Sequence, residues 1–137
     1  MSRLNLAILI SGRGSNMEAL IKAAAAPDYP ACPVLVLSNR PDALGLETAL
    51  ASGVQTVAID HKPYGKDREA FERAMDTALI GAGTEIIALA GFMRVLTPWF
   101  VNRWQGRMIN IHPSLLPKYK GLDTHQRAID AGDTEAG

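Results

Sequence analysis

The sequence is poor in cysteine, in excess charge of either sign and in long apolar runs. Its 137 residues contain one cysteine, Cys32, so no intrachain disulfide can form, and no cluster of metal ligands is visible. Basic and acidic residues number 14 each, without a basic tract, which argues against nucleic acid or an anionic membrane as a partner. The first apolar run is too short for a membrane span and lacks the features of a signal peptide. These absences indicate a cytoplasmic protein of one domain.

Short apolar runs alternate with helical patterns, which is typical of an α/β protein. The predicted strands are residues 4–10, 34–37, 56–59, 85–90 and 108–112. The predicted helices are residues 16–26, 44–52, 67–80, 98–104 and 124–131. Ser15 is predicted to cap the first helix with Glu18 three residues later, and Thr97 to cap the fourth. We expect a Rossmann-like, open and mostly parallel sheet with helices on both faces.

A polar pair occurs where the last predicted strand ends. Asn110 and His112 alternate with apolar residues, so both project from one face, and Pro113 then ends regular pairing. Open α/β sheets bind ligands at such carboxyl ends. An imidazole can transfer a proton near neutral pH, and an amide can donate a hydrogen bond to a developing oxyanion. Asn110 and His112 are therefore the candidate catalytic residues of an acyl-type transfer.

A glycine-containing segment, Ser-Gly-Arg-Gly-Ser-Asn at residues 11–16, joins the first predicted strand to the first helix. Glycines permit a tight turn, and a helix N-terminus binds phosphate through its free N–H groups. The expected anion contacts are Gly14, Ser15 and Asn16. The segment is not a dinucleotide fingerprint, because Met17 replaces the third glycine, and it is not a Walker loop. The alternative is a tight turn that binds no ligand.

Other candidate residues have ordinary structural alternatives. Arg94 follows the fourth predicted strand and either contacts a ligand or extends into solvent. Arg68 is a candidate anion contact on a helix whose charged face would otherwise be solvated. His61 and His125 are interpreted as structural or solvated residues.

Three motifs resemble those of the phosphoribosylglycinamide formyltransferases of purine biosynthesis. They are the glycine segment, the stretch Ala-Leu-Ala-Gly-Phe-Met-Arg-Val-Leu at 88–96, and Asn-Ile-His-Pro-Ser-Leu-Leu-Pro at 110–117, followed by Lys-Tyr-Lys-Gly. The resemblance extends over all 137 residues. The third motif is shared by the wider formyltransferase superfamily, whereas its combination with the glycine segment is specific to the purine enzyme.

The resemblance implies transfer of a formyl group from 10-formyltetrahydrofolate, as co-substrate, to the amine of glycinamide ribonucleotide, without a metal. It implies that Gly14, Ser15 and Asn16 hold the ribotide phosphate and that Asn110 and His112 are catalytic. The residues implied to line the folate pocket are Arg68, Met93, Arg94, Val95, Leu96 and Asn110.

The family's third catalytic residue is an aspartate that follows the last predicted helix, and no such motif occurs before Gly137. We therefore expect residues 1–137 to be the N-terminal portion of one formyltransferase domain, with the family's C-terminal strands and helices absent from this chain. The resemblance leaves a homodimer open.

Four other functions fit parts of the sequence. A formyltetrahydrofolate deformylase-like hydrolase would share the catalytic loop but would need no ribotide phosphate site. A methionyl-tRNA formyltransferase would require a nucleic-acid surface that the balanced charge does not provide. In a nucleotide-binding oxidoreductase, Arg40 could contact a 2′-phosphate, although Met17 argues against that reading. The fourth is a non-catalytic phosphate-binding remnant.

Overall fold

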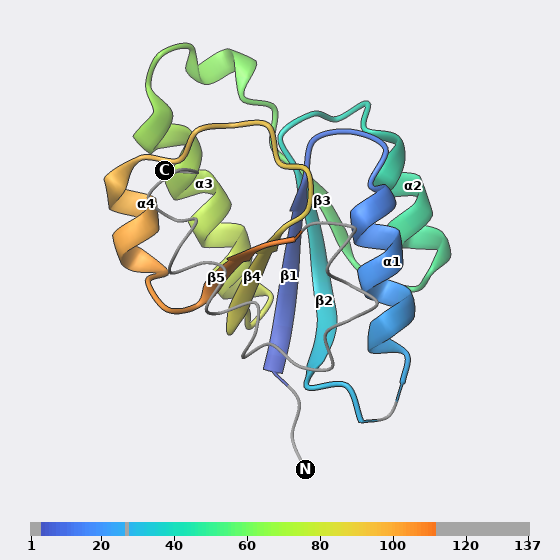
Figure 1. Cartoon of the computed structure of the whole chain (residues 1–137). Helices are drawn as coiled ribbons and strands as arrows, with labels where there is room; N and C mark the ends of the chain where they lie inside the picture. The colour runs from blue at the N-terminus through green and yellow to red at the C-terminus, as the bar shows by residue number, and fades with distance from the viewer. Residues whose placement is uncertain (1–3, 27, 112–137) are drawn as a thin grey trace.

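The computed structural model describes residues 4–26 and 28–111. In this part of the chain, five strands form one parallel sheet in the order β3-β2-β1-β4-β5 (Figure 1). The strands are β1 (Leu4–Ile10), β2 (Ala31–Ser38), β3 (Thr56–Ala58), β4 (Ile86–Leu89) and β5 (Met108–Asn110). Because all strands point the same way, their carboxyl ends lie at one edge of the sheet.

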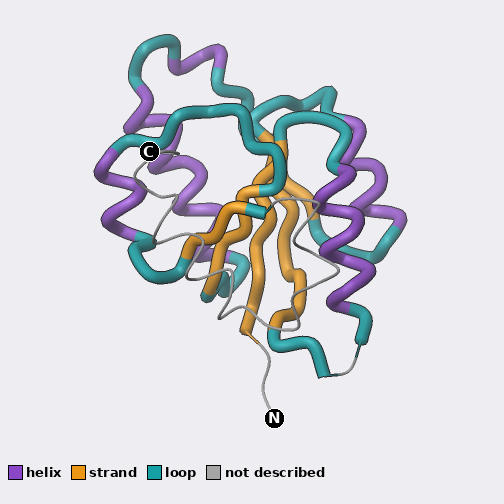
Figure 2. Tube along the Cα trace, viewed as in Figure 1, coloured by secondary structure: helices purple, strands orange, loops and turns teal. Residues whose placement is uncertain are grey.

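Helices cover both faces of this sheet (Figures 1 and 2). Helices α1 (Ser15–Ala24) and α2 (Leu44–Ala51) lie on one face. Helices α3 (Arg68–Gly81) and α4 (Pro98–Arg103) lie on the other, with a 3₁₀ turn, η1 (Lys62–Tyr64), before α3. The expected Rossmann-like fold is confirmed. Across the two described ranges, every helix is too short or too polar to cross a bilayer.

Alternate residues of β1 pack against opposite helical layers. Leu6, Ile8 and Ile10 contact the layer of α1 and α2, whereas Ala7 and Leu9 contact the layer of α3 and α4. All five are fully buried. Because helices cover both faces of this central strand, residues 6–10 are apolar at every position and show no polar alternation.

The boundaries of the second strand differ from the prediction. It begins at Ala31 instead of 34, so Cys32 lies in a strand and not in the loop before it. The β1–β2 register shifts where Leu6 pairs with Pro33 and Ala7 with Leu35. Proline has no N–H to donate to the ladder, so the prediction from the apolar pattern began the strand only after Pro33 and missed its irregular first residues.

The other elements end within one or two residues of their expected limits, while the predicted helix at 124–131 lies outside the described residues. The predicted helix caps need correction. Ser15 is the first residue of α1, and the cap position belongs to Gly14, which has no side chain to offer. Thr97 does occupy the cap position of α4, but its side chain makes no capping bond and its hydroxyl donates to Glu72 instead.

Thr84, between α3 and β4, has a buried hydroxyl that makes no hydrogen bond with any described residue. Because an unpaired buried hydroxyl is unfavourable, Thr84→Val should raise the free energy of unfolding by about 1 kcal/mol. Urea unfolding at constant m-value measures the change. A lower free energy of unfolding in the valine variant would show that the hydroxyl does have a partner.

Candidate active site

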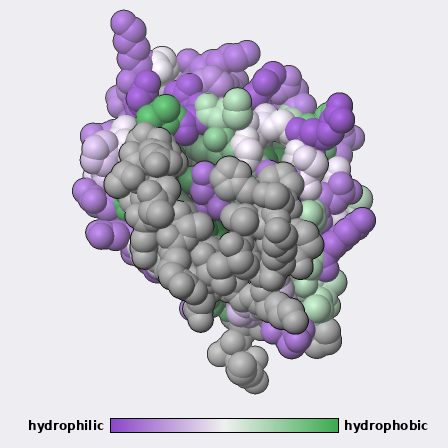
Figure 3. All heavy atoms as spheres, viewed as in Figure 1, coloured by the Kyte–Doolittle hydropathy of each residue, from purple (hydrophilic) through white to green (hydrophobic). Residues whose placement is uncertain are grey.

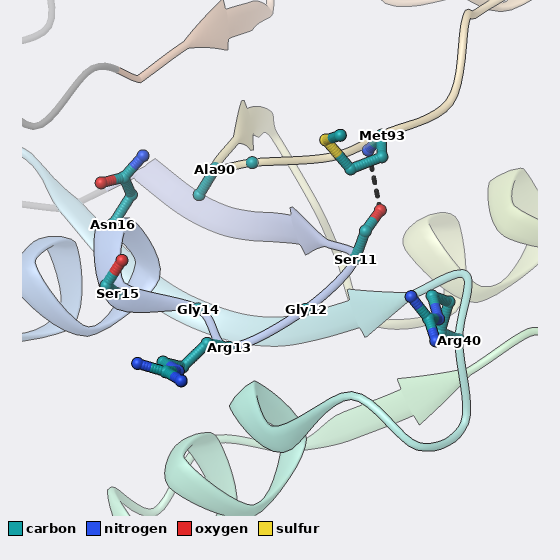
Figure 4. Close-up of a pocket in the computed structure, with 10 residues that line it drawn as sticks. Ser11, Gly12, Arg13, Gly14, Ser15, Asn16, Arg40, Ala90 and Met93 are labelled. Atoms are coloured by element: carbon teal, nitrogen blue, oxygen red, sulfur yellow. Dashed lines mark hydrogen bonds between the residues drawn. The ribbon is translucent and has the colours of Figure 1, made fainter.

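A pocket of about 430 Å³ opens at the carboxyl edge of the sheet (Figure 4). It lies where the strand order reverses between β1 and β4, the position at which open α/β sheets bind ligands. Three segments line it: the glycine loop (residues 11–16), Arg40 after β2, and Ala90, Gly91 and Met93 after β4. Among the described residues that line it, two are arginines and none is acidic, which favours an anion.

The backbone conformation of Gly14 explains why the glycine loop has a glycine at this position, just before α1. Its φ of 78° lies in the left-handed region, and an added Cβ would stand 3.1 Å from Gly45 Cα. The first helical hydrogen bond runs from the Glu18 amide to the Gly14 carbonyl, at 2.8 Å. The cap residue Gly14 has no side chain to bond the first amides of α1. Gly14, Ser15 and Asn16 all line the pocket, so these amides can donate to a ligand there.

Gly45, on α2, packs against the glycine loop. The sequence analysis did not identify this residue. Its amide donates to the Gly12 carbonyl at 3.0 Å. An added Cβ would stand 2.5 Å from Ile10 Cδ1 and 3.1 Å from the Arg13 carbonyl oxygen. A glycine inside a predicted helix is a signal of close packing, and it could have directed attention to this position.

The segment after β4, which we call the Met93 loop (residues 91–96), divides its side chains between solvent and core. Met93 is 80% exposed and Val95 is 56% exposed. Leu96, implied to line the folate pocket, instead packs into the core of α3 and α4. The face drawn in Figure 3 carries apolar residues, in green, among hydrophilic ones near its upper end.

Arg94 lies over the ring of Phe71, with its Cζ atom 5.8 Å from the ring centroid. Arg68 is exposed in the first turn of α3, three residues before Phe71 and therefore on the same side of the helix. Of the two predicted folate contacts, Arg94 contacts the Phe71 ring, and Arg68 lies one helical turn before Phe71 on α3.

A buried carboxylate that the sequence analysis missed anchors the far end of the Met93 loop. Glu72 of α3 is fully enclosed and accepts hydrogen bonds from the Thr97 amide, at 2.7 Å, and from the Thr97 hydroxyl. The amide at the N-terminus of α4 is therefore satisfied from a neighbouring helix. An acidic residue at a core position of a predicted helix was the available signal.

Asn110 ends β5 beside Leu89 of β4, and it is half-buried. Ile109 and Ile111 pack against the layer of α1, whereas Met108 packs against α3 and α4. Asn110 therefore shares the face of Met108, which is the face that the Met93 loop crosses on its way to α4.

The glycine loop lies close to this strand end, since Asn16 Nδ2 is 3.5 Å from the Ile111 carbonyl oxygen. The predicted anion contacts and Asn110 thus belong to one edge of the sheet. His112 lies outside the described residues. In residues 4–26 and 28–111, no group of three or more histidine, cysteine, aspartate or glutamate side chains could hold a metal.

An all-parallel sheet with a glycine loop and a pocket at its switch point places the chain in the Rossmann-like class of α/β proteins. The chain belongs to the formyl transferase family, whose sequence model matches residues 4–137.

Three similar proteins illustrate the relationship. The chain is 49% identical over 132 residues to the trifunctional purine biosynthetic protein adenosine-3 of Chironomus tentans, covering 95% of this chain and 10% of that protein. It is 42% identical over 134 residues to the phosphoribosylglycinamide formyltransferase of Escherichia coli (strain K12), covering 98% of this chain and 63% of that enzyme. It superimposes with a TM-score of 0.77 on phosphoribosylglycinamide formyltransferase from Brucella melitensis, at 50% identity over 96% of this chain and 68% of that one. The chain therefore spans a tenth to two-thirds of these relatives.

Proposed function

We propose that the chain carries the site that transfers a formyl group from 10-formyltetrahydrofolate to the amine of glycinamide ribonucleotide. The observation that carries the proposal is the pocket at the β1–β4 switch point. One side of it is the glycine loop at the N-terminus of α1, and the other is a loop with exposed apolar side chains. The similar proteins named phosphoribosylglycinamide formyltransferase support the choice of substrates.

The glycine loop suits the phosphate of the ribotide. Amides of Gly14, Ser15 and Asn16 would donate to its oxygens, and the dipole of α1 favours the negative charge. Arg13 and Arg40 also line this pocket and add positive charge. Arg40 pairs with Asp42 at 3.4 Å, but both side chains are exposed, so that contact is weak and leaves Arg40 available.

The Met93 loop and the start of α3 suit the folate. Met93 and Val95 present apolar side chains against which a flat ring can pack. The guanidinium of Arg94 lies over Phe71, and Arg68 is exposed one helical turn earlier on α3, so both can pair with carboxylates of the ligand. The backbone of Leu96 completes this side, while its side chain belongs to the core.

Asn110 and His112 would act on the reacting atoms. A bond forms between the ribotide amine and the formyl carbon, and negative charge develops on the formyl oxygen. The Asn110 amide and a protonated His112 donate hydrogen bonds to that oxygen. His112 also carries the proton that leaves the amine toward the folate nitrogen, whose bond to the formyl carbon breaks. No protein nucleophile takes part.

The partners in this proposal are two small molecules, and the proposed location is the cytoplasm. A self-associated dimer remains a hypothesis, and we propose no role for nucleic acid or a membrane surface.

The test is single-turnover transfer of labelled formyl from 10-formyltetrahydrofolate, with glycinamide ribonucleotide or water as the acceptor. We expect label in the ribotide product only when the ribotide is present. Release of formate at the same rate without ribotide would support the deformylase-like alternative. Tight binding of NADPH without transfer would support the oxidoreductase alternative.

A further inference from the structure

One buried hydroxyl joins the three segments that line the pocket. Ser11 begins the glycine loop and is 3% exposed. Its Oγ accepts a hydrogen bond from the Met93 amide at 2.7 Å (Figure 4). The same Oγ lies 2.5 Å from Asn39 Oδ1, and Asn39, 2% exposed, directly precedes the pocket residue Arg40. A single side chain therefore contacts the ends of β1, β2 and β4.

The Met93 loop depends on this contact. Residues 91–96 belong to no helix or strand, and in the described part of the chain their backbone makes a single hydrogen bond, from the Met93 amide to Ser11. The loop is otherwise anchored at its far end, where Thr97 is bound by Glu72. Without Ser11, the stretch that carries Met93 would lose its polar attachment to the glycine loop.

The geometry fixes the direction of the two hydrogen bonds at Ser11 Oγ. Because Ser11 Oγ accepts from the Met93 amide, its own hydrogen points to Asn39 Oδ1. The amide nitrogen of Asn39 then faces His61, where Nδ2 lies 3.2 Å from Nδ1. His61 Nδ1 also lies 3.1 Å from the Asn39 carbonyl oxygen. His61 Nδ1 can accept from the Asn39 side-chain amide or donate to the Asn39 carbonyl, depending on the tautomer of the ring.

We propose that Ser11 and Asn39 are positioning residues that hold Met93, Arg40 and the glycine loop in register for formyl transfer. This inference rests on the proposed function. Transfer between two bound substrates requires the two binding loops to keep a fixed separation, and a misplacement of about 1 Å can lower the rate about 10²-fold. Buried and fully paired polar groups provide such rigidity.

A first experiment needs no substrate. Amide hydrogen exchange in the full chain should become at least about tenfold faster at Met93 in Ser11→Ala, because that amide loses its acceptor. The Ile87 amide, bonded to the Arg107 carbonyl, should keep its protection. Ser52→Ala is the matched control, since it removes an exposed hydroxyl bonded to the Thr48 carbonyl on α2.

A second experiment measures kcat and KM for both substrates. Ser11→Ala and Asn39→Ala should each lower kcat/KM by about 10- to 100-fold. The double variant should lose little more than Ser11→Ala alone, because both changes break one connection. Ser11→Thr keeps the hydroxyl that accepts from the Met93 amide and should retain most of the activity and the Met93 protection. It also serves if an alanine variant fails to fold.

The outcomes separate the two proposals. If the wild-type protein transfers no formyl group to the ribotide, the proposed function fails, whatever the exchange at Met93. If the wild type is active but Ser11→Ala and Asn39→Ala match Ser52→Ala in kcat/KM, the positioning role is wrong, even with faster exchange at Met93.

Discussion

Asn110→Ala is expected to lower kcat for formyl transfer by about 10²–10³, with much less change in the affinity for either substrate. Asn110 lies at the carboxyl end of β5, on the face crossed by the Met93 loop, where it can donate to the formyl oxygen. A donor of this kind acts on charge that develops in the transition state, so its loss appears in kcat. His112→Ala should be at least as damaging, since it also removes a proton carrier worth about 10²–10⁴.

Single-turnover transfer at saturating substrates, together with direct binding measurements, checks this expectation. Asn102→Ala, at an exposed position of α4, is the matched control and should leave the transfer rate and the substrate affinities unchanged. The double variant of Asn110 and His112 should lose less than the product of the single losses, because both groups act on one oxygen. A defect confined to substrate affinity would reduce the pair to a binding role.

Gly14→Val is expected to weaken ribotide binding by about 10²-fold or more and to leave folate binding almost intact. Valine at a φ of 78° is strained by about 1–3 kcal/mol, and its Cβ would meet Gly45 Cα at 3.1 Å. The loop must therefore move, and its amide N–H groups no longer point toward the phosphate. Two charge-assisted hydrogen bonds lost at about 1.5–3 kcal/mol each account for a change of this size.

Titration calorimetry with each substrate separately measures the two affinities. Gly53→Val is the matched control, because Gly53 also has a positive φ, of 84°, but has no atom within 4 Å of an added Cβ and lies away from the pocket. Gly53→Val should reproduce the backbone strain without lowering the affinity for the ribotide. Equal weakening of both ligands by Gly14→Val would mean that the loop has a structural role only.

Local patterns in the sequence were sufficient for the class of fold. The apolar run of β1 and the alternation of Met108, Ile109 and Asn110 in β5 follow from the period of a strand, and the structure confirms both. The cap of α1 was mistaken because Ser15 fits the preferred residue type, while the left-handed backbone of Gly14 is a conformational fact that composition does not reveal.

Contacts between distant residues could not be predicted in this way. Ser11 and Asn39 are 28 residues apart, and Ser11 and Met93 are 82 apart, so their hydrogen bonds exist only through the strand order. Leu96 shows that the direction of a loop side chain is also hard to predict from sequence. Its motif indicates a loop, but whether a loop side chain faces solvent or core depends on the helices beneath it.

The two anchors of the Met93 loop have an evolutionary consequence. Ser11 holds the Met93 amide and Glu72 holds Thr97 directly after the loop, while the side chains of Met93 and Val95 extend into solvent and contribute little to the core. Surface substitutions of that kind usually change stability by less than about 0.5 kcal/mol. Natural variation at Met93 and Val95 can therefore alter the chemistry that this loop presents to a ligand without endangering the fold. Diverging members of such a family can acquire new ligand preferences at these two positions.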